Sequence, residues 1–565
     1  MSSLHRRGNL LVGLALIVPL LLAACGPGSS STGSQGPKQE PLRTLTLDYY
    51  SGAKGELAST LDPAQVTSAD DADTIALSNA NLVHILPNNT VAPDLATWTV
   101  SKDRKVYTFT IRKDARFSNG HSVTAADAAY SIKRALAPET RSPVAVTYMG
   151  LIEGAEAYHT GKAKDLTGVK VLGERKLQIT ISQPAEYFLL TLAYPTADVL
   201  DRQVMKGKEA SAANNYLTTT CRGNQGAGPF KFVCNNDNSD RTSFYKAGRT
   251  PQYSLVPNEY YYGAKPTIKL VLPAVNTVDT NYKQYLAGDA DMTAVPTSYI
   301  SRWKGSKEFH TYPTSIVTYL SPNTRKTPFD NQHCRLALAY GIDRETIAHD
   351  ILHDSTYPEY VVVPRGYLGY YDGKATEPHF DLKRAKAELQ QCPNRDMTVE
   401  VVYPTGTSDA DRLFAAIGHM MQQVGFKVKI KAVTANDWLN VVTRPLNATN
   451  TQLVRNGWQQ DYPDPHDYLS VLLRSDAQYN IGQWKNPEYD RLVDRAAQEP
   501  NREKRAKLYR QAQHLALSEG AWIALTNTIG QHLIKPYVHG LVGTPAYGNL
   551  VPVNYDWSKV HVDAH

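Results

Sequence analysis

Side chains that can do chemistry gather in one short stretch of the chain, at Asp461, Asp464, His466 and Asp467. Carboxylates and an imidazole can accept hydrogen bonds, transfer protons or bind a metal ion. The prolines between them break any helical register, so we expect a solvated loop here rather than a metal site. Asp461 also has a structural role open to it, because aspartate in a proline-rich turn can accept hydrogen bonds from nearby backbone amides.

The rest of the chain lacks the common catalytic motifs. It contains no Gly-x-Ser-x-Gly elbow, no phosphate-binding Gly-x-x-x-x-Gly-Lys loop and no His-Glu-x-x-His zinc motif. Carboxylate pairs arise by chance among 54 acidic residues, so they do not indicate a glycosidase. We therefore expect a protein that is not an enzyme and that holds no cofactor or metal, with a secreted hydrolase as the remote alternative.

The N-terminal segment has the pattern of a secretory signal. Arg6 and Arg7 precede an apolar run, Leu10–Leu22, which is followed by small residues and Cys25. The run is shorter than the roughly 20 apolar residues of a membrane-spanning helix, which is the less favoured alternative. Leu-Ala-Ala-Cys resembles the bacterial lipobox, so we expect lipid on Cys25 and anchoring to the outer face of the cell membrane. Residues 26–42, which begin rich in Gly, Ser and Pro, are the expected flexible tether.

Length and charge bound the class of protein. Removing residues 1–25 from the 565 leaves 540, more than one hydrophobic core usually serves, so two or three lobes are expected. The formal net charge of +6 is spread without a long basic run, which argues against nucleic-acid binding. Tyrosine is abundant, with 34 residues against 11 phenylalanines, and it suits surfaces that must be apolar and hydrogen-bonding at once.

Besides the expected lipidation site, the chain has four cysteines: Cys221, Cys234, Cys334 and Cys392. An even number in an exported protein favours disulfides over free thiols, which remain the alternative. Among the three possible connectivities we expect Cys221 with Cys234 and Cys334 with Cys392.

Short β-like runs alternate with helical stretches through the whole body, which is the pattern of an α/β protein. Strands are predicted at residues 45–47, 106–111, 177–181 and 399–402. Thr124 and Asp127 are spaced as a capping box at the start of a helix. Further helices are predicted at residues 334–341, 382–390 and 411–424, the last of them closed by Gly425.

A series of motifs along almost the entire body resembles the family 5 extracellular solute-binding proteins, which are receptors for oligopeptides, dipeptides and, in some members, nickel, haem or sugars. The motifs are densest between residues 101 and 131, where Tyr-Thr-Phe, Phe-Ser-Asn-Gly and Thr-Ala-Ala-Asp follow one another in the family's order. Others are Val91–Trp98, Gly226–Lys231, Pro257–Tyr261, Arg335–Arg344, Gly457–Pro465 and Asn486–Asp490.

The resemblance implies an α/β, two-lobed periplasmic-binding-protein-like clamp (type II, or cluster C) with an extra domain inserted in the first lobe. The first lobe would take residues 43–60, 183–315 and 530–565, the inserted domain 61–182, and the second lobe 316–529. Chain crossings near residues 316 and 530 would form the hinge over which the lobes close on a ligand.

The resemblance also implies a site and partners. In peptide-binding members an aspartate soon after the Gly-Trp pair binds the ligand's α-amino group, and Asp461 stands at that position. The backbone of Gly457, Trp458 and Gln459 would pair with the ligand as a strand does. Arg455 matches a basic position that can reach the ligand carboxylate, although an ordinary ion pair is an equal alternative. We expect a monomer that captures peptides and delivers them to the permease and ATPase subunits of an ABC importer; a sugar, nickel chelate or haem is the alternative ligand.

Overall fold

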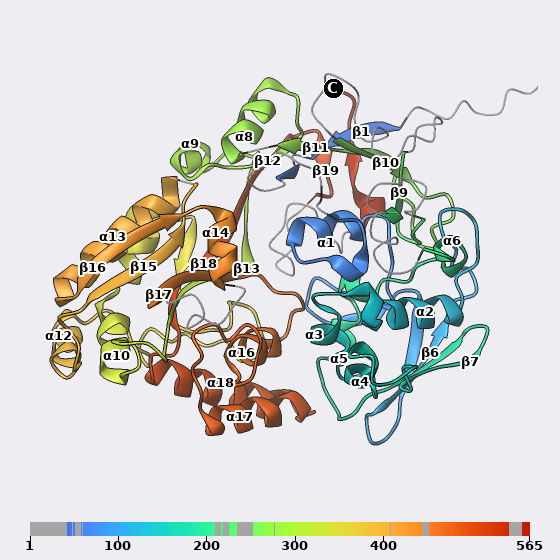
Figure 1. Ribbon diagram of the computed structural model, residues 1–565. Helices are drawn as coiled ribbons and strands as arrows, with labels where there is room; N and C mark the ends of the chain where they lie inside the picture. The colour runs from blue at the N-terminus through green and yellow to red at the C-terminus, as the bar shows by residue number, and fades with distance from the viewer. Residues whose placement is uncertain are drawn as a thin grey trace, which may run out of the picture. The chain divides into compact units, whose positions relative to one another are not determined.

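The computed structural model describes most of the chain after the tether (Figure 1), namely residues 42–47, 49–50, 58, 60–208, 216–217, 225–233, 252–275, 277–406, 408–442, 451–541 and 556–565. Cys25, Cys221 and Cys234 lie outside the described residues, and so do the signal and nearly all of the tether. Among the helices that the structure does describe, none is both long and apolar enough to cross a bilayer.

The first sheet is mixed and joins segments that are far apart in the sequence. Its strands are β1 (Arg43–Thr46), β2 (Tyr49–Tyr50), β9 (Phe230–Phe232), β10 (Gln252–Pro257) and β11 (Ile268–Val275). Their order is β1-β11-β10-β9, with β1 parallel to β11 and β2 also pairing with β11. Leu45, Leu255 and Leu270 are fully buried, so the alternating residues of these strands form one side of a core.

The second sheet is antiparallel and is built from residues 96–180. Its order is β5-β6-β8-β7, formed by β5 (Ala96–Val100), β6 (Val106–Ile111), β7 (Val169–Gly173) and β8 (Lys176–Thr180). In β6 the alternating residues Tyr107, Phe109 and Ile111 are buried. A hairpin of β3 (Val83–Ile85) and β4 (Val91–Pro93) lies beside it in sequence.

Helix α2 (Ala125–Leu136) begins where the capping box predicts. The backbone N–H of Thr124 donates to the Asp127 carboxylate at 2.9 Å, and the backbone N–H of Asp127 donates to the Thr124 hydroxyl at 3.3 Å. Two of the otherwise unpaired amides at the helix start are thereby satisfied.

The third sheet has seven strands in the order β12-β18-β13-β17-β15-β16, with β14 against β18. The strands are β12 (Met292–Ala294), β13 (Phe309–Pro322), β14 (Thr356–Pro358), β15 (Thr398–Pro404), β16 (Lys427–Val433), β17 (Leu453–Trp458) and β18 (Ile523–Ile534). Successive residues of its central strands face opposite cores: Leu320 belongs to one and Tyr319 to the other.

Helices cover both faces of this sheet. The core on the Leu320 side is closed by α10 (Gln332–Gly341), α12 (Leu382–Gln390) and α13 (Ser408–Val424). The core on the Tyr319 side is closed by α16 (Pro465–Leu473), α17 (Pro487–Gln498) and α18 (Arg502–Ser518). The three helices predicted from residues 334, 382 and 411 are therefore confirmed, and Gly425 follows α13 with a φ of 121° that few other residues adopt.

Cys334 and Cys392 form the disulfide expected for them, which ties α10 to the turn after α12. Their Cα atoms are 4.9 Å apart. The remaining described helices are α1 (Ala69–Ala76), α3 (Ala145–Met149), α4 (Ala155–His159), α5 (Phe188–Thr191), α6 (Arg202–Met205), α8 (Val278–Ala287), α9 (Ile300–Trp303), α11 (Arg344–Thr346) and α14 (Ala435–Val442).

Strands β13 and β18 run antiparallel over their full length and link separate cores. Their pairing extends from Phe309 opposite Leu533 to Leu320 opposite Ile523, with an irregularity between Pro313 and Val317. Leu533 packs with residues 282–309, whereas Ile523 packs in the core formed by residues 320–525. We propose that the hinge lies at this irregularity, close to the crossings expected near residues 316 and 530.

Candidate functional site

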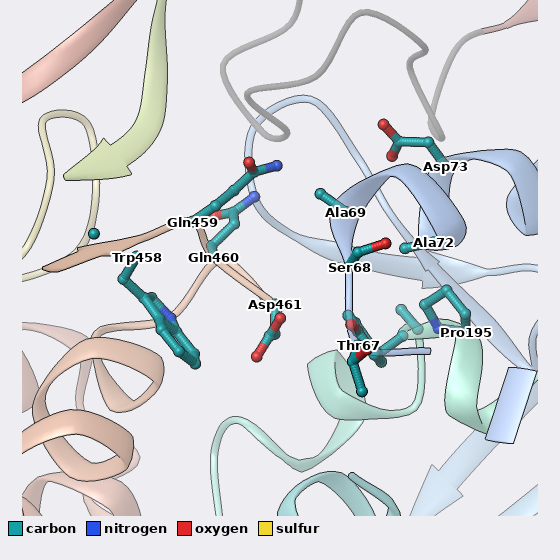
Figure 2. Close-up of a pocket in the computed structure, with 13 residues that line it drawn as sticks. Thr67, Ser68, Ala69, Ala72, Asp73, Pro195, Trp458, Gln459, Gln460 and Asp461 are labelled. Carbon is teal, nitrogen blue, oxygen red and sulfur yellow. The ribbon is translucent and has the colours of Figure 1, made fainter. Parts of the chain in front are cut away.

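A cavity of about 220 Å³ lies between two walls that come from distant parts of the chain (Figure 2). One wall is Thr67–Ala69, Ala72 and Asp73 together with Ala193–Pro195, and the other is Gly457–Asp461. Four of the five predicted site residues, Gly457, Trp458, Gln459 and Asp461, are therefore brought together here.

The first wall is the start of α1 and the turn that packs beside it. Ser68 caps α1, since its hydroxyl accepts a hydrogen bond from the backbone N–H of Asp71 at 3.2 Å. This cap fixes where the helix begins and so places Ala69 and Ala72 toward the cavity. Small side chains at these positions keep the space open.

The second wall is the end of β17 and the turn after it. On one side β17 pairs with β13 along its whole length, from Leu453 opposite Pro322 to Trp458 opposite Val317. On the other side β15 pairs only with Leu453 and Val454, and among the described residues no strand continues beyond them. The second half of β17 therefore has an edge without a strand partner.

Asp461 lies at the far end of this wall, with its carboxylate toward the cavity (Figure 2). Burial raises the pKa of its carboxyl to about 7, although hydrogen bonds from the hydroxyls of Tyr148 and Tyr194 work in the opposite direction. Among the described residues, no lysine, arginine or histidine is within ion-pair distance of this carboxylate. Asp461 is thus a half-buried carboxyl group that has hydroxyl partners and, among the described residues, no cation beside it.

A second carboxylate, that of Asp467, holds the turn through hydrogen bonds. One of its oxygens accepts hydrogen bonds from the backbone N–H of Asp461 and the indole N–H of Trp458, each at 3.0 Å. Burial, followed by the charge of Asp461, raises the pKa of this carboxyl well above its usual range. Asp467 therefore fixes the positions of Trp458 and Asp461 and favours a negative charge on only one of the two aspartates.

Tyr148 and Tyr194 come from α3 and from just before Pro195, more than 250 positions from Asp461 in the sequence. Their rings are packed at 4.2 Å between centroids, and both residues are buried. Burial and the nearby Asp461 charge raise the pKa of both hydroxyls, so they stay protonated and can donate. Sequence reasoning missed these two residues; the abundance of tyrosine was the only signal for them.

Gln460 is a further residue of the cavity that sequence reasoning did not single out. The residue is 5% exposed, and among the described residues neither its amide oxygen nor its amide nitrogen has a hydrogen-bond partner. An unsatisfied buried amide costs about 1–3 kcal/mol. Because Gln460 lines the cavity but both amide atoms are closed off from solvent, a ligand can supply the missing partners once the amide turns toward it.

Arg455 does not line the cavity with the other predicted residues. It projects from β17 next to Gly457, where its guanidinium lies 5.8 Å from the Trp438 ring centroid and contacts the Thr318 hydroxyl at 3.4 Å. Burial lowers its pKa, and within the described part of the chain no carboxylate pairs with it. It is therefore a half-buried cation without an anion among the described residues, close to the open half of β17.

The stretch from Asp464 to Asp467 is not the solvated loop expected from its prolines. Asp464 caps α16 and its carboxylate pairs with Arg505 at 2.7 Å. His466 stacks on Tyr187 with 3.6 Å between ring centroids, and its Nδ1 lies 2.7 Å from the Tyr462 hydroxyl oxygen. The prediction of a solvated loop was wrong because Pro465 occupies the first position of helix α16, where proline fits well. The helix directs these side chains into the core.

Comparison with known proteins places the chain in a family. The model of the bacterial extracellular solute-binding proteins, family 5, matches residues 90–480. The oligopeptide-binding protein OppA of Bacillus subtilis is 28% identical, covering 90% of this chain and 92% of its own, and the periplasmic OppA of Escherichia coli is 27% identical over 95% and 97%. The solved structure of the Escherichia coli murein tripeptide-binding protein MppA shares the fold with a TM-score of 0.75, at 24% identity, over 93% of this chain and 99% of that one. The two-lobed α/β architecture is thus shared with known binding proteins, and the chain belongs to the family 5 extracellular solute-binding proteins.

Proposed function

We propose that this protein is the extracytoplasmic receptor of an ABC importer and that it captures peptides by closure of its two lobes. The observation that carries the proposal is Asp461, a half-buried carboxylate at a cavity with no cation beside it among the described residues. A peptide brings an ammonium group, which is the charge this site lacks. The names of the relatives above, which bind oligopeptides, support the same ligand class.

The ammonium group would complete a small set of hydrogen bonds. It can donate to the Asp461 carboxylate while Tyr148 and Tyr194 keep donating to the same group. A hydrogen bond to a charged group of this kind contributes about 1.5–3 kcal/mol, or roughly ten-fold or more in affinity. Asp467 would hold the Asp461 backbone in position during binding.

The ligand backbone would lie along the open half of β17. Peptide amides adding to a strand edge give affinity without reading side chains, since every residue of the ligand offers the same groups. Gln460 would supply a side-chain donor and acceptor beside this edge. Gly457 also leaves room beside it, because a Cβ there would lie 3.2 Å from the Val317 carbonyl oxygen and 3.6 Å from the Arg455 guanidinium.

Arg455 would attract the ligand's carboxylate. It is a half-buried guanidinium that has no carboxylate partner among the described residues, and it projects from the strand whose edge would bind the ligand. Closure of the lobes would bring the carboxylate end toward it, because Arg455 does not line the cavity in this structure.

The remaining parts of the proposal concern location and partners. We propose that Cys25 carries the lipid that holds the protein at the outer face of the membrane, and that residues 26–42 let the body reach the permease. The absence of common catalytic motifs supports a receptor that releases its ligand unchanged to the permease and ATPase subunits.

The direct test is identification of ligands by mass spectrometry after mild denaturation of the purified protein, followed by calorimetric titration of the stripped and refolded protein. Peptides found in the extract and confirmed by titration would support the proposal. If titration gives no heat with peptides but does with oligosaccharides, a nickel chelate or haem, the family assignment stands and the proposed ligand is wrong.

A further inference from the structure

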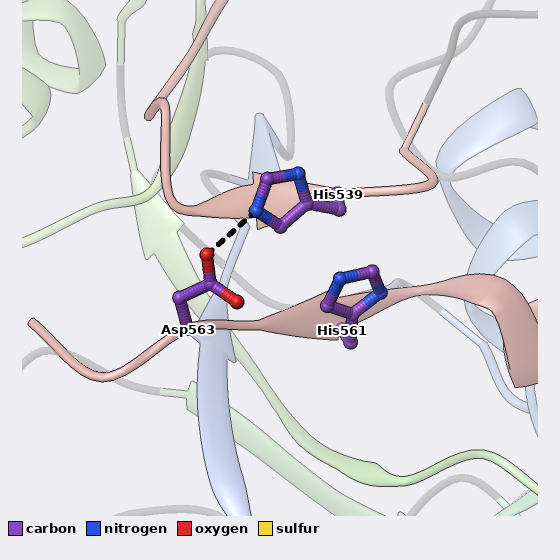
Figure 3. A group of neighbouring side chains, drawn as sticks. All are labelled: His539, His561 and Asp563. Atoms are coloured by element: carbon purple, nitrogen blue, oxygen red, sulfur yellow. Dashed lines mark hydrogen bonds and ion pairs between the residues drawn. The ribbon is translucent and has the colours of Figure 1, made fainter.

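Three side chains that can ligate a metal gather on one face of a pair of short strands (Figure 3), and none of them lines the Asp461 cavity. The strands are β19 (Val538–His539) and β20 (His561–Val562), which pair antiparallel with His539 directly opposite His561. Asp563 is two residues beyond His561, and its backbone N–H donates to Tyr537 O at 2.9 Å. Since side chains two apart share a face, His539, His561 and Asp563 all project from the same side.

The ligand atoms are already close together. His539 Nε2 lies 2.8 Å from Asp563 Oδ2, and the two imidazole rings are stacked at 4.6 Å between centroids. One ligand atom from each of the three residues lies within 4.8 Å of the other two. Bonds of about 2.0–2.1 Å to a tetrahedral metal put the ligand atoms roughly 3.3 Å apart, so small side-chain rotations suffice.

His561 has a partner that prepares it for coordination. Its Nδ1 lies 3.3 Å from the carbonyl oxygen of Lys559, which places the proton on that nitrogen and leaves Nε2 with a lone pair. Metal-binding histidines usually donate their second ring N–H to a carbonyl or carboxylate in this way. The two strands are held in place by the core, in which Val538, Trp557, Val560 and Val562 are buried.

We propose that His539, His561 and Asp563 form a binding site for a borderline divalent cation, of which Zn²⁺ is the representative. Two imidazole nitrogens and one carboxylate oxygen suit zinc, copper or nickel better than calcium or magnesium, which prefer oxygen ligands. Three protein ligands leave at least one position for water or another ligand. The bound ion would join residues 538–539 to 561–563, and this proposal does not depend on the nature of the solute in the cavity.

The test is calorimetric titration of the purified protein, stripped with EDTA and exchanged into metal-free buffer at neutral pH, with ZnCl₂. We expect one saturable Zn²⁺ site, and His561→Ala should lower its affinity for Zn²⁺ by at least about 10- to 100-fold. Losses of this size already follow from removing a residue that only hydrogen-bonds to a metal ligand. Excess Mg²⁺ should not compete. His419→Ala, which removes an exposed histidine of α13 outside this cluster, is the matched control and should leave the affinity unchanged.

Thermal unfolding supplies a second readout. Zn²⁺ should raise the midpoint temperature of unfolding of the wild type and of His419→Ala, because an ion that binds only the folded state stabilises it. It should not raise that of Asp563→Asn. The midpoints without metal show whether each variant is folded. Absence of saturable Zn²⁺ binding by folded wild type, or unchanged binding by folded His561→Ala, would overturn the proposal.

Discussion

Asp461 and Asp464 lie in the same turn, Asp461 half-buried and Asp464 buried, and their surroundings differ. Asp464 accepts a hydrogen bond from the backbone N–H of His466 at 2.9 Å and pairs with Arg505 at 2.7 Å. Asp461 has tyrosine hydroxyls but no described cation, and its carboxyl has a raised pKa. A buried carboxylate with its cation therefore serves the fold, whereas a half-buried carboxylate at a cavity without a described cation is available to a ligand.

The same contrast holds for two arginines. Arg505 has the Asp464 carboxylate, the Tyr509 hydroxyl and the Ala496 carbonyl as partners. Arg455 contacts the Thr318 hydroxyl and lies near the Trp438 ring and the Tyr319 hydroxyl, with no carboxylate partner among the described residues. Substitutions at the paired residues should therefore change stability, and those at the unpaired residues should change binding.

The largest expected effect is on the structural pair. Arg505→Met should lower the free energy of unfolding by about 3–5 kcal/mol, because it leaves the buried Asp464 carboxylate without its cation. Urea unfolding followed by circular dichroism measures this loss, while peptide affinity per folded molecule should be unchanged. A loss under about 1 kcal/mol, as for an exposed ion pair, would show that the Arg505–Asp464 pair does not stabilise the fold as a buried pair does.

Arg455→Met should behave in the opposite way. We expect it to leave stability unchanged or slightly higher, since it removes a half-buried charge without a described anion. It should lower the affinity for a peptide with a free carboxylate by about ten-fold or more. A C-terminally amidated peptide is the control in a calorimetric titration and should bind both proteins equally; an equal loss for the amide would exclude contact with the ligand carboxylate.

The pH dependence follows from the raised pKa of Asp461. Burial moves this pKa from 3.8 to about 7, so the unliganded protein takes up a proton as the pH falls through that range. Because ammonium binding needs the ionised carboxylate, peptide affinity should fall about ten-fold per pH unit below the raised pKa. Calorimetric titration at several pH values checks this slope.

Stability should respond to pH with the opposite sign. Since the folded state holds this proton more tightly than the unfolded state, the Asp461 contribution favours folding more as the pH falls from about 7 to about 4. Asp461→Asn should remove both this stability trend and the affinity trend. Parallel curves for the wild type and the variant would show that Asp461 does not titrate in this range.

The smallest expected effect is at Gln460. Gln460→Ala should weaken peptide binding by about 0.5–1.5 kcal/mol, the usual contribution of a neutral hydrogen bond. Gln423→Ala, in the exposed Gln423–His419 pair of α13, is the matched control. If competition titrations with one reference peptide give the same affinity for both variants, the orphan amide has no role in binding.

Much of the fold could be predicted from the sequence because its signals are local. The strand at residues 106–111 and the helix at 382–390 have the predicted bounds, since alternation of apolar residues and the capping and closing residues act over a few positions. The Cys334–Cys392 disulfide also agreed with the expectation.

The electrostatic surroundings of the site could not be predicted in the same way. The motif around Gly457 identified the segment, but the partners of Asp461 come from Tyr148 and Tyr194, which no local pattern connects to it. The burial of His466 depends on stacking with Tyr187, a contact across 279 positions of the sequence. Such contacts are set by how the elements pack, which the sequence of either segment alone does not specify.

The central claim is that Asp461 binds the ammonium group of a peptide. Calorimetric titration of wild type and Asp461→Asn with one tripeptide, in its free and N-acetylated forms, tests it most directly. We predict that the substitution lowers the affinity for the free peptide by about ten-fold or more. The weaker affinity for the acetylated peptide should stay unchanged. An equal loss for both peptides would contradict the account, because the carboxylate would then act on the fold of the site and not on the ammonium group.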